Sequence, residues 1–404
     1  MSSSGISLFA TPRSLQPYHK KLIFVILAVL IAMTFALSVF GWRQSALFII
    51  GNLFGISLYH ASFGFASAYR KLFVRGEIKG ILAQILMLAS ATLLFAPLLL
   101  SGSIGGHEVR GAVFPVGVPG AIGAFLFGVG MQLGSGCACG TLYTIGGGSS
   151  MMMLTLLTFC IGSFWSTLTS GFWSKFPETQ PLSLIEQWGW LGVSIQLLIF
   201  VVLAYFLWLW GKNRLSDHQE SLPNALQDSP SLIHAFLYGP WSLPFGALML
   251  AFLNGLTLVI AGRPWGVTWG FTLWAAKIAQ VLGWNPSTSE YWSQGAAAEA
   301  LSRTIFADVI SVMNLGIIIG AALAACLAGR LALKKPASRS AIIAALVGGL
   351  LMGYGARLAF GCNVGAYFSG IASTSLHGWL WIALALAGTA VGVKIRPIFQ
   401  LSNG

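Results

Sequence analysis

Long apolar runs separated by short polar segments dominate the chain. The clearest runs lie at residues 21–40, 45–65, 81–100, 150–170, 190–210, 245–262 and 305–328. Two more, at 116–133 and 341–360, lead into glycine-rich segments, and shorter or interrupted runs lie at 265–283 and 378–393. A helix needs roughly 20 residues to cross about 30 Å of hydrocarbon. The pattern therefore predicts an all-α, multi-pass membrane protein, surrounded by lipid, with about nine to thirteen helices.

Composition supports this interpretation. Of the 404 residues, 56% are hydrophobic and only 8% are charged, and the mean hydropathy is +0.80. A soluble globule of this size would need more polar surface than that. The sequence contains no Walker A, HExxH or dinucleotide-binding glycine motif, so ATP-driven transport would require another subunit.

Basic residues lie at the ends of the apolar runs. The clusters are Lys20 and Lys21; Arg70, Lys71, Arg75 and Lys79; Lys212 and Arg214; Arg330, Lys334, Lys335 and Arg339; and Lys394 and Arg396. Such a distribution is typical of cytoplasmic loops. Segments with few basic residues, around Glu178, Glu186, Glu290 and Glu299, should then face outward. Membrane topology thus explains the net charge of +12 without a nucleic-acid partner.

A Gly/Cys segment occurs twice, at a constant offset of 225 residues. Residues 126–140 read LFGVGMQLGSGCACG, and residues 351–365 read LMGYGARLAFGCNVG. The shared residues of the first copy are Leu126, Gly128, Gly130, Leu133, Gly136, Cys137 and Gly140. Chance similarity between apolar stretches rarely aligns several glycines around one cysteine. The repeat predicts a duplicated unit that places a thiol, Cys137 or Cys362, at a break in each of two helices.

The charges around the repeat predict that its two copies are inverted. Residues 101–115, before the first copy, carry little charge, whereas residues 330–339, before the second copy, carry four cations. The two copies should therefore enter the bilayer from opposite sides, as in many secondary transporters whose broken helices meet near the midplane. We expect an N-terminal segment with an extra helix at 1–44, a first half at 45–210, a cytoplasmic connection at 211–240 and a second half at 241–404.

A weaker pair of segments precedes the two copies. Residues 55–69 and 255–270 each contain an aromatic-Gly step, Phe63-Gly64 in the first and Trp265-Gly266 in the second. Each half would then contain one aromatic-Gly break and one Gly-Cys break. This spacing makes Gly64 and Gly266 candidate pathway residues.

A broken helix offers a specific chemistry. Glycine permits non-helical backbone and close approach of a ligand, and the next half-helix presents free N–H groups and a positive dipole end to an anion. Breaks of this kind must line a cavity or pack against protein, because lipid cannot satisfy the freed polar groups. Candidate residues of the first copy are Gly136, Gly140 and Thr141, and those of the second are Gly361 and Gly365. Helix packing through small residues is the alternative for the glycines.

Four interpretations of Cys137 and Cys362 remain open: substrate contact, redox activity, metal binding and packing. The sequence has no CxxC pair for redox chemistry. A soft-metal site could combine Cys137, Cys139 and Cys362, with Met151–Met153 nearby, although few histidines are available. A thiol that faces the polarizable sulfur of a substrate needs no metal or cofactor, and we favour that interpretation. Cys160 and Cys326 are expected to be packing residues.

At these residues the chain resembles the YeeE/YedE family of bacterial inner-membrane sulfur transporters, over about residues 50–393. The resemblance rests on Gly136-Cys137-Ala138 with Gly140-Thr141, on Gly353 to Arg357 leading to Gly361-Cys362, and on the segments that begin at Gly55 and Gly255. It implies an hourglass-shaped helical protein that binds thiosulfate through S–H···S contacts and passes it inward. It also implies a small cytoplasmic sulfur-carrier protein as partner.

The resemblance assigns roles to individual residues. Cys137 and Cys362 fall on two of the family's three functional cysteines. The third normally lies in an aromatic-Cys step, which is Phe63-Gly64 in this chain. Cys139 is a candidate replacement thiol, and its alternative role is to fill the helix break.

Charged residues inside apolar segments are further candidates. Arg357 precedes Cys362 by five residues, and Arg263 stands beside Pro264. Either guanidinium could hold an anion, or it could reach the interface or pair with a polar group. Asp308 is expected near a helix start, where it would complement the helix dipole.

The sequence thus predicts a non-enzymatic importer of thiosulfate or a related sulfur anion in the bacterial inner membrane, with no metal or cofactor. Alternatives are a transporter of a selenium-containing anion or a soft metal, a membrane-embedded thiol enzyme that carries persulfide sulfur, and a structural or channel-forming protein.

Overall fold

The computed structural model describes residues 17–215, 232–334 and 338–403. Within these ranges, 10 helical segments are long and apolar enough to cross a membrane. The same ranges contain one small sheet, the hairpin of β1 (Ser103–Ile104) and β2 (His107–Glu108). The prediction of an all-α, multi-pass membrane protein is confirmed.

The helices form two similar series along the chain. The first series is α1 (Pro17–Leu37), α2 (Trp42–His60), α3 (Phe65–Arg75), α4 (Lys79–Ser101), α5 (Val118–Leu133), α6 (Ala138–Gly146) and α7 (Ser150–Leu168). The second is α10 (Trp190–Leu215), α12 (Leu243–Ala261), α13 (Thr268–Val281), α16 (Val309–Leu327), α17 (Arg339–Leu358), the π-helix η4 (Asn363–Ser369), α18 (Gly370–Ala372) and α19 (Leu376–Ile395). Short helices connect them: α8 (Ser170–Trp173), α9 (Leu184–Trp188), α11 (Leu232–Tyr238), α14 (Glu290–Ser293) and α15 (Gly295–Ser302).

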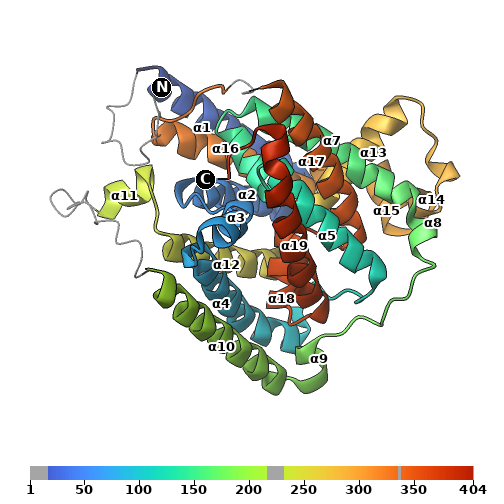
Figure 1. The fold of residues 1–404 in the computed structure, drawn as a ribbon. Helices are drawn as coiled ribbons and strands as arrows, with labels where there is room; N and C mark the ends of the chain where they lie inside the picture. Colours follow the sequence, from blue (N-terminus) through green and yellow to red (C-terminus); the bar gives the residue numbers. More distant parts are fainter. Residues whose placement is uncertain (1–16, 216–231, 335–337, 404) are drawn as a thin grey trace.

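Helices of the two series pack in reciprocal pairs. Helix α2 packs on α16, and its counterpart α12 packs on α4. In the same way α7 packs on α17 and α19 on α5, and at the periphery α1 lies on α16 and α10 on α4 (Figure 1). Such an exchange of partners is what a twofold relation between two halves produces. The inverted orientation of the halves in the membrane and their exact boundaries stay predictions.

The upstream glycines of the repeat allow close helix packing. A Cβ added to Gly128 would lie 2.2 Å from the carbonyl oxygen of Ala385, and one added to Gly353 would lie 2.1 Å from that of Phe159. The two positions are equivalent in the repeat and pack α5 on α19 and α17 on α7. For these glycines the packing alternative is correct, because small residues let membrane helices approach closely.

Four breaks interrupt the predicted spans. They lie at residues 61–64 between α2 and α3, 134–137 between α5 and α6, 262–267 between α12 and α13, and 359–362 between α17 and η4. All four fall in the segments that the sequence indicated. In the predicted connection 211–240, α10 extends to Leu215 and α11 occupies Leu232–Tyr238. The polar stretch 217–230 lies outside the described residues.

Candidate functional site

The two Gly-Cys breaks have the same backbone geometry. Ser135 after α5 and Phe360 after α17 both adopt a left-handed conformation with φ 57°. The next residue, Gly136 or Gly361, donates its N–H to the carbonyl of Met131 or Ala356, five residues back, at 3.2 or 2.8 Å. This pattern is the Schellman ending of a helix, which normally has glycine at the left-handed position. At each break, α5 or α17 therefore ends in a regular C-terminal motif, and the break is not a distorted stretch inside one continuous helix.

Each cysteine begins the next helix. Cys137 is the N-cap of α6, and its sulfur accepts a hydrogen bond from the N–H of Gly140 at 3.4 Å. Cys362 is the N-cap of η4, and its sulfur accepts from the N–H of Val364 at 3.4 Å. Helix α6 thus starts at Ala138 and η4 at Asn363, directly after the two cysteines. The reason is that the thiol itself satisfies a first-turn donor.

The first break carries a pair of thiols. The sulfurs of Cys137 and Cys139 lie 3.5 Å apart, and the hydroxyl of Thr141 donates to the carbonyl of Cys137 at 2.9 Å. All three side chains are buried. Cys137 also lies close enough to Cys362 for an electrostatic interaction between the thiols. The structure thus brings both halves of the repeat together at one sulfur-lined point in the main core.

The glycines downstream of each cysteine differ from the packing glycines. A Cβ on Gly140 would meet only the sulfur of Cys137, at 3.3 Å, and one on Gly365 would meet nothing within 4 Å. On the N-terminal side of Cys137, the nearest atom to a Cβ on Gly136 is the sulfur of Met152, at 3.5 Å. Open space therefore lies beside Gly365, whereas the nearest atoms to a Cβ on Gly136 or Gly140 are sulfur atoms rather than the backbone of another helix.

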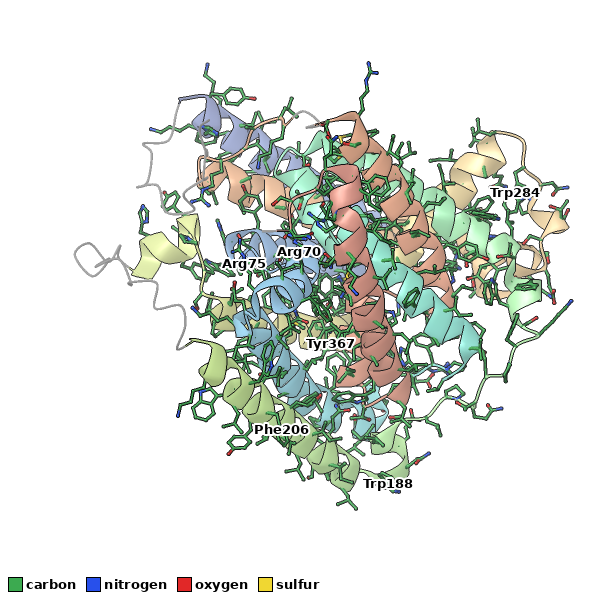
Figure 2. The ribbon with its side chains drawn as sticks, in the orientation of Figure 1. Arg70, Arg75, Trp188, Phe206, Trp284 and Tyr367 are labelled. Atoms are coloured by element: carbon green, nitrogen blue, oxygen red, sulfur yellow. The ribbon has the colours of Figure 1, made fainter. Side chains whose placement is uncertain are left out.

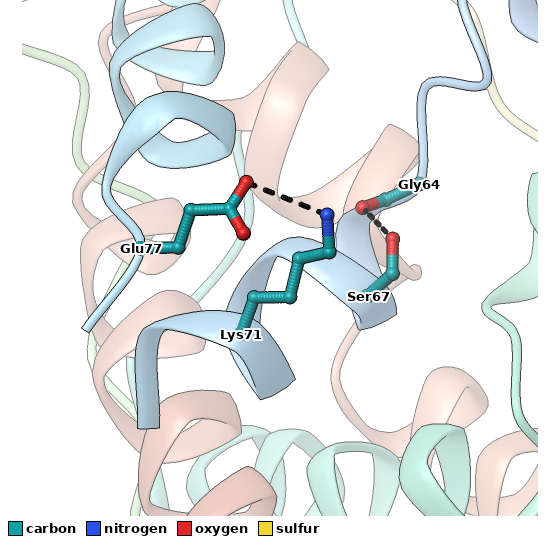
Figure 3. A network of polar contacts seen from close by, with 4 residues as sticks. All are labelled: Gly64, Ser67, Lys71 and Glu77. Carbon is teal, nitrogen blue, oxygen red and sulfur yellow. Dashed lines mark hydrogen bonds and ion pairs between the residues drawn. The ribbon is translucent and has the colours of Figure 1, made fainter. Parts of the chain in front are cut away.

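Gly64 is the N-cap of α3 and lies at the first aromatic-Gly break. Its φ of −113° is open to any residue, so backbone conformation does not require a glycine. Instead, a Cβ would lie 2.5 Å from the hydroxyl of Ser67 and 3.7 Å from that of Tyr143. Ser67 donates to the carbonyl of Gly64 at 2.9 Å, next to the Lys71–Glu77 ion pair (Figure 3). The hydroxyl of Ser67 therefore occupies the space that a side chain at position 64 would need.

The second aromatic-Gly break is held by polar residues that sequence reasoning missed. Asn254 on α12 accepts from the N–H of Trp265 at 2.8 Å and donates to Ser369 on η4 at 3.1 Å. Ser369 in turn donates to the carbonyl of Trp265 at 2.7 Å. Gly266 follows Trp265, and a Cβ there would lie 3.3 Å from the Ile310 side chain. The network ties this break to the helix that carries Cys362.

The first half contacts the second cysteine through Tyr69 of α3. Asn363, directly after Cys362, donates to the hydroxyl of Tyr69 at 3.3 Å. Tyr367, one turn further along η4 and labelled in Figure 2, stacks on Trp381 with ring centroids 6.2 Å apart. Trp381 also donates to the carbonyl of Gly361 at 3.3 Å. Neither Asn363 nor Tyr69 stood out in the sequence, because their contact joins residues 294 positions apart.

The structure places the two predicted arginines together on the side of α13. The guanidinium of Arg357 lies over the rings of Trp269 and Tyr291, 5.8 and 5.5 Å from their centroids, and within the described residues it has no carboxylate partner. Arg263 lines a pocket of about 230 Å³ that also contains Trp269 and Asp308. Both cations therefore border the same aromatic residue.

Other predicted residues have structural roles. Asp308 is the N-cap of α16 and accepts from the N–H of Ser311 at 2.7 Å, as expected near a helix start. All five cysteines lie in the described ranges and are free, with Cys326 buried and Cys160 half-buried. In the described part of the chain, no three His, Cys, Asp or Glu residues gather as ligands of a metal ion.

Comparisons with known proteins agree with this arrangement. The sequence model of the family described as sulphur transport matches residues 60–391, most of the chain. The probable transporter YedE of Escherichia coli K12 is 34% identical over 171 residues, which are 42% of this chain and 41% of that protein. The match therefore spans less than half of YedE.

Two thiosulfate transporters named TsuA match over longer segments. The protein of Spirochaeta thermophila is 26% identical over 348 residues, 82% of this chain and 92% of its own length. That of Escherichia coli K12 is 24% identical over 364 residues, 86% of this chain and 94% of its own. The relatives' names are those of transporters, not enzymes. The chain therefore belongs to the sulphur transport family, as its paired Gly-Cys segments predicted.

Proposed function

We propose that the protein imports thiosulfate, or a closely related sulfur-containing anion, across the bacterial inner membrane. The observation that carries the proposal is the placement of Cys137 and Cys362 in one buried core cluster, each as the N-cap at a helix break and each followed three residues later by a glycine. Family membership supports transport, and the TsuA relatives support thiosulfate as the first anion to test.

The proposed route starts at the pocket beside Arg263. There the guanidinium of Arg263 attracts the anion from the outer side, and Arg357 lies over Trp269, which lines the same pocket. Trp269 and Tyr291 hold Arg357 in place through cation–π contacts, which leave its N–H donors available for an anion. The anion then passes the thiols of Cys362, Cys137 and Cys139, which contact its outer sulfur.

The thiols suit this substrate because of charge and softness. The outer sulfur of thiosulfate is polarizable and accepts weak S–H hydrogen bonds, while the N-terminal dipole of α6 favours its negative charge. Weak contacts are appropriate, because a substrate bound too tightly at the centre would not leave. No metal or cofactor has a role in this scheme.

Net accumulation requires a further driving force. The membrane potential opposes anion entry by about 2.3 kcal/mol per charge per 100 mV. Rapid consumption inside the cell, with transfer to a small cytoplasmic sulfur-carrier protein, would supply it.

The test is growth of a host that lacks its own thiosulfate uptake, with thiosulfate as sole sulfur source. The wild-type protein should restore growth, and Cys137→Ala and Cys362→Ala should abolish it. Cys326→Ala is the matched control, because that thiol is buried inside α16 and belongs to neither Gly-Cys break. Membrane abundance is measured for every variant. Growth on another sulfur source but not on thiosulfate would overturn the substrate assignment, and unimpaired growth of both cysteine variants would overturn the role of the thiols.

A further inference from the structure

Two arginines that neither the motifs nor the proposed function uses converge on the first Gly-Cys break. Arg70 lies on α3, and Arg396 lies directly after α19. Both bind Gln132 in the last turn of α5. The Nη1 atom of Arg70 donates to the side-chain Oε1 of Gln132 at 3.4 Å, and the Nη1 atom of Arg396 donates to its main-chain oxygen. Three elements thus bring two cations to one residue.

Arg396 is fixed in place. It is only 4% exposed, and its guanidinium also donates to the hydroxyl of Ser135 at 3.3 Å and to the carbonyl of Ser402. The Gln132 carbonyl, which also accepts from the N–H of Ser135 at 3.4 Å, lies at the C-terminal end of α5, where a cation is favourable. Its charge is therefore held rigidly next to the break.

Arg70 is only lightly engaged. It is half-buried, and its one hydrogen bond to a described residue is the long contact with Gln132. A guanidinium has five N–H donors, so most of those of Arg70 have no partner in the described part of the protein. Gln132 in turn is anchored by its amide, which donates to the carbonyl of Ala66 at 3.1 Å. Gln132 thus positions the Arg70 side chain, and several N–H donors of Arg70 remain available for a ligand.

Among the described residues, no acidic group neutralises this pair. In the described ranges no carboxylate lies within 4 Å of Arg70 or Arg396, and the nearby Glu77 pairs with Lys71 (Figure 3). Arg75, labelled with Arg70 in Figure 2, adds a third positive charge close to Arg70. Two guanidinium groups that repel each other beside a break are unfavourable unless an anion joins them.

Solvent reaches this point from the side of Ser135. Ser135 is exposed and Gly136 half-buried, whereas Cys137 next to them is buried. Ser135 accepts from Arg396, so its own hydroxyl hydrogen remains able to donate to a ligand. The guanidinium of Arg396 thus contacts the exposed residue of the break, two positions before the buried thiol.

We propose that Arg70, with Arg396 and Ser135, forms a second binding site, for a doubly charged tetrahedral oxyanion, on the solvent side of Cys137. A planar guanidinium binds two oxygens of such an anion at once. The cluster lies in the basic segments predicted to be cytoplasmic, so it is the site from which a transported anion is released. This release role rests on the proposed function, whereas the binding site itself does not.

The test measures sulfate binding to the purified full-length protein by calorimetry. Sulfate is the probe because it has the charge and shape of the ligand but no outer sulfur for the thiols. Arg70→Gln should weaken sulfate binding at least about tenfold, the effect expected for loss of hydrogen bonds to a charged group. Arg75→Gln, which removes the same charge from the same helix end, is the control and should change affinity less than about threefold.

Equal affinities of Arg70→Gln and Arg75→Gln would overturn the site. Should Arg70→Gln fail to fold, the wild-type protein provides the second measurement: modification of arginines by phenylglyoxal, mapped by mass spectrometry. Sulfate should slow modification of Arg70 but not of Arg75, and equal rates with and without sulfate would contradict the proposal. Sulfate binding at this site without any thiosulfate uptake would refute the proposed function and leave the site intact.

Discussion

The break after α5 and the break after α17 share a backbone but not their surroundings. Both end in a left-handed residue, a glycine and an N-cap cysteine. The first continues as an α-helix, contains a second thiol and is bordered by Arg70 and Arg396. The second continues as a π-helix and is held by Tyr69 and Trp381. The duplicated part of the sequence therefore sets the position of the thiols, and the unduplicated neighbours set what each thiol meets.

This difference suggests a division of labour. In the second copy, the cation Arg357 precedes Cys362 and lies over Trp269, which also lines the Arg263 pocket. The equivalent residue of the first copy is Gln132, which binds Arg70 and Arg396 from other elements. The second copy thus has a cation within its own sequence, whereas the cations beside the first copy come from other helices. Anion entry and anion release would then depend on different arginines around equivalent cysteines.

The largest expected change separates the packing glycines from the pathway glycines. Gly353→Ala places a methyl group 2.1 Å from the Phe159 carbonyl and should lower the free energy of unfolding by about 1–3 kcal/mol. Gly365→Ala has open space around it and should leave stability almost unchanged while it slows uptake. Thermal unfolding in detergent, with uptake measured in parallel, checks both. A stable Gly353→Ala protein would refute the packing role.

A smaller effect is expected at the contact between the halves. Tyr69→Phe removes the hydroxyl that accepts from Asn363 and leaves the amide without its partner. The expected loss of stability is about 1 kcal/mol, the usual value of a buried hydrogen bond. Chemical unfolding provides the measurement, and Tyr354→Phe on α17 is a control that removes the hydroxyl of a half-buried tyrosine, which accepts from Trp173. Selective loss of uptake in the Tyr69 variant alone would indicate that the contact also positions the second thiol.

The second thiol of the first break should have a modest influence on transport. Cys139→Ser removes the 3.5 Å sulfur contact with Cys137 but keeps a small polar side chain. Because such contacts are worth about 0.5–1 kcal/mol, the uptake rate should fall by about two- to fivefold. An unchanged uptake rate would mean that Cys139 only fills space. A complete loss of uptake would mean that transport needs Cys139 as much as Cys137.

The smallest expected effect concerns the left-handed residue. Ser135→Gly relieves about 1 kcal/mol of conformational cost but loses the hydroxyl contact with Arg396, which is worth about as much. Stability should therefore change by less than about 0.5 kcal/mol. A clearly more stable variant in thermal unfolding would mean that the Arg396 contact contributes little.

The sequence predicted much of the fold and part of the site. Apolar runs predicted the spans, and the offset of 225 residues predicted two equivalent breaks with Cys137 and Cys362 at them. The N-cap role of Cys137 and Cys362 was not predicted, because cysteine is not among the usual N-cap residues. The contact between Arg396 and Gln132 was not predictable, since it joins residues 264 positions apart without any periodic signal. The same holds for Asn254 and Ser369, which look like isolated polar residues in apolar helices.

The central claim is that the anion passes both cysteines. Its most direct test is the initial rate of thiosulfate uptake by purified protein in liposomes, where no intracellular consumption contributes. We expect uptake by the wild type and by Cys326→Ala, and a loss of at least about tenfold in both Cys137→Ala and Cys362→Ala, at equal protein content. Uptake at the wild-type rate by either of these two variants would contradict the account.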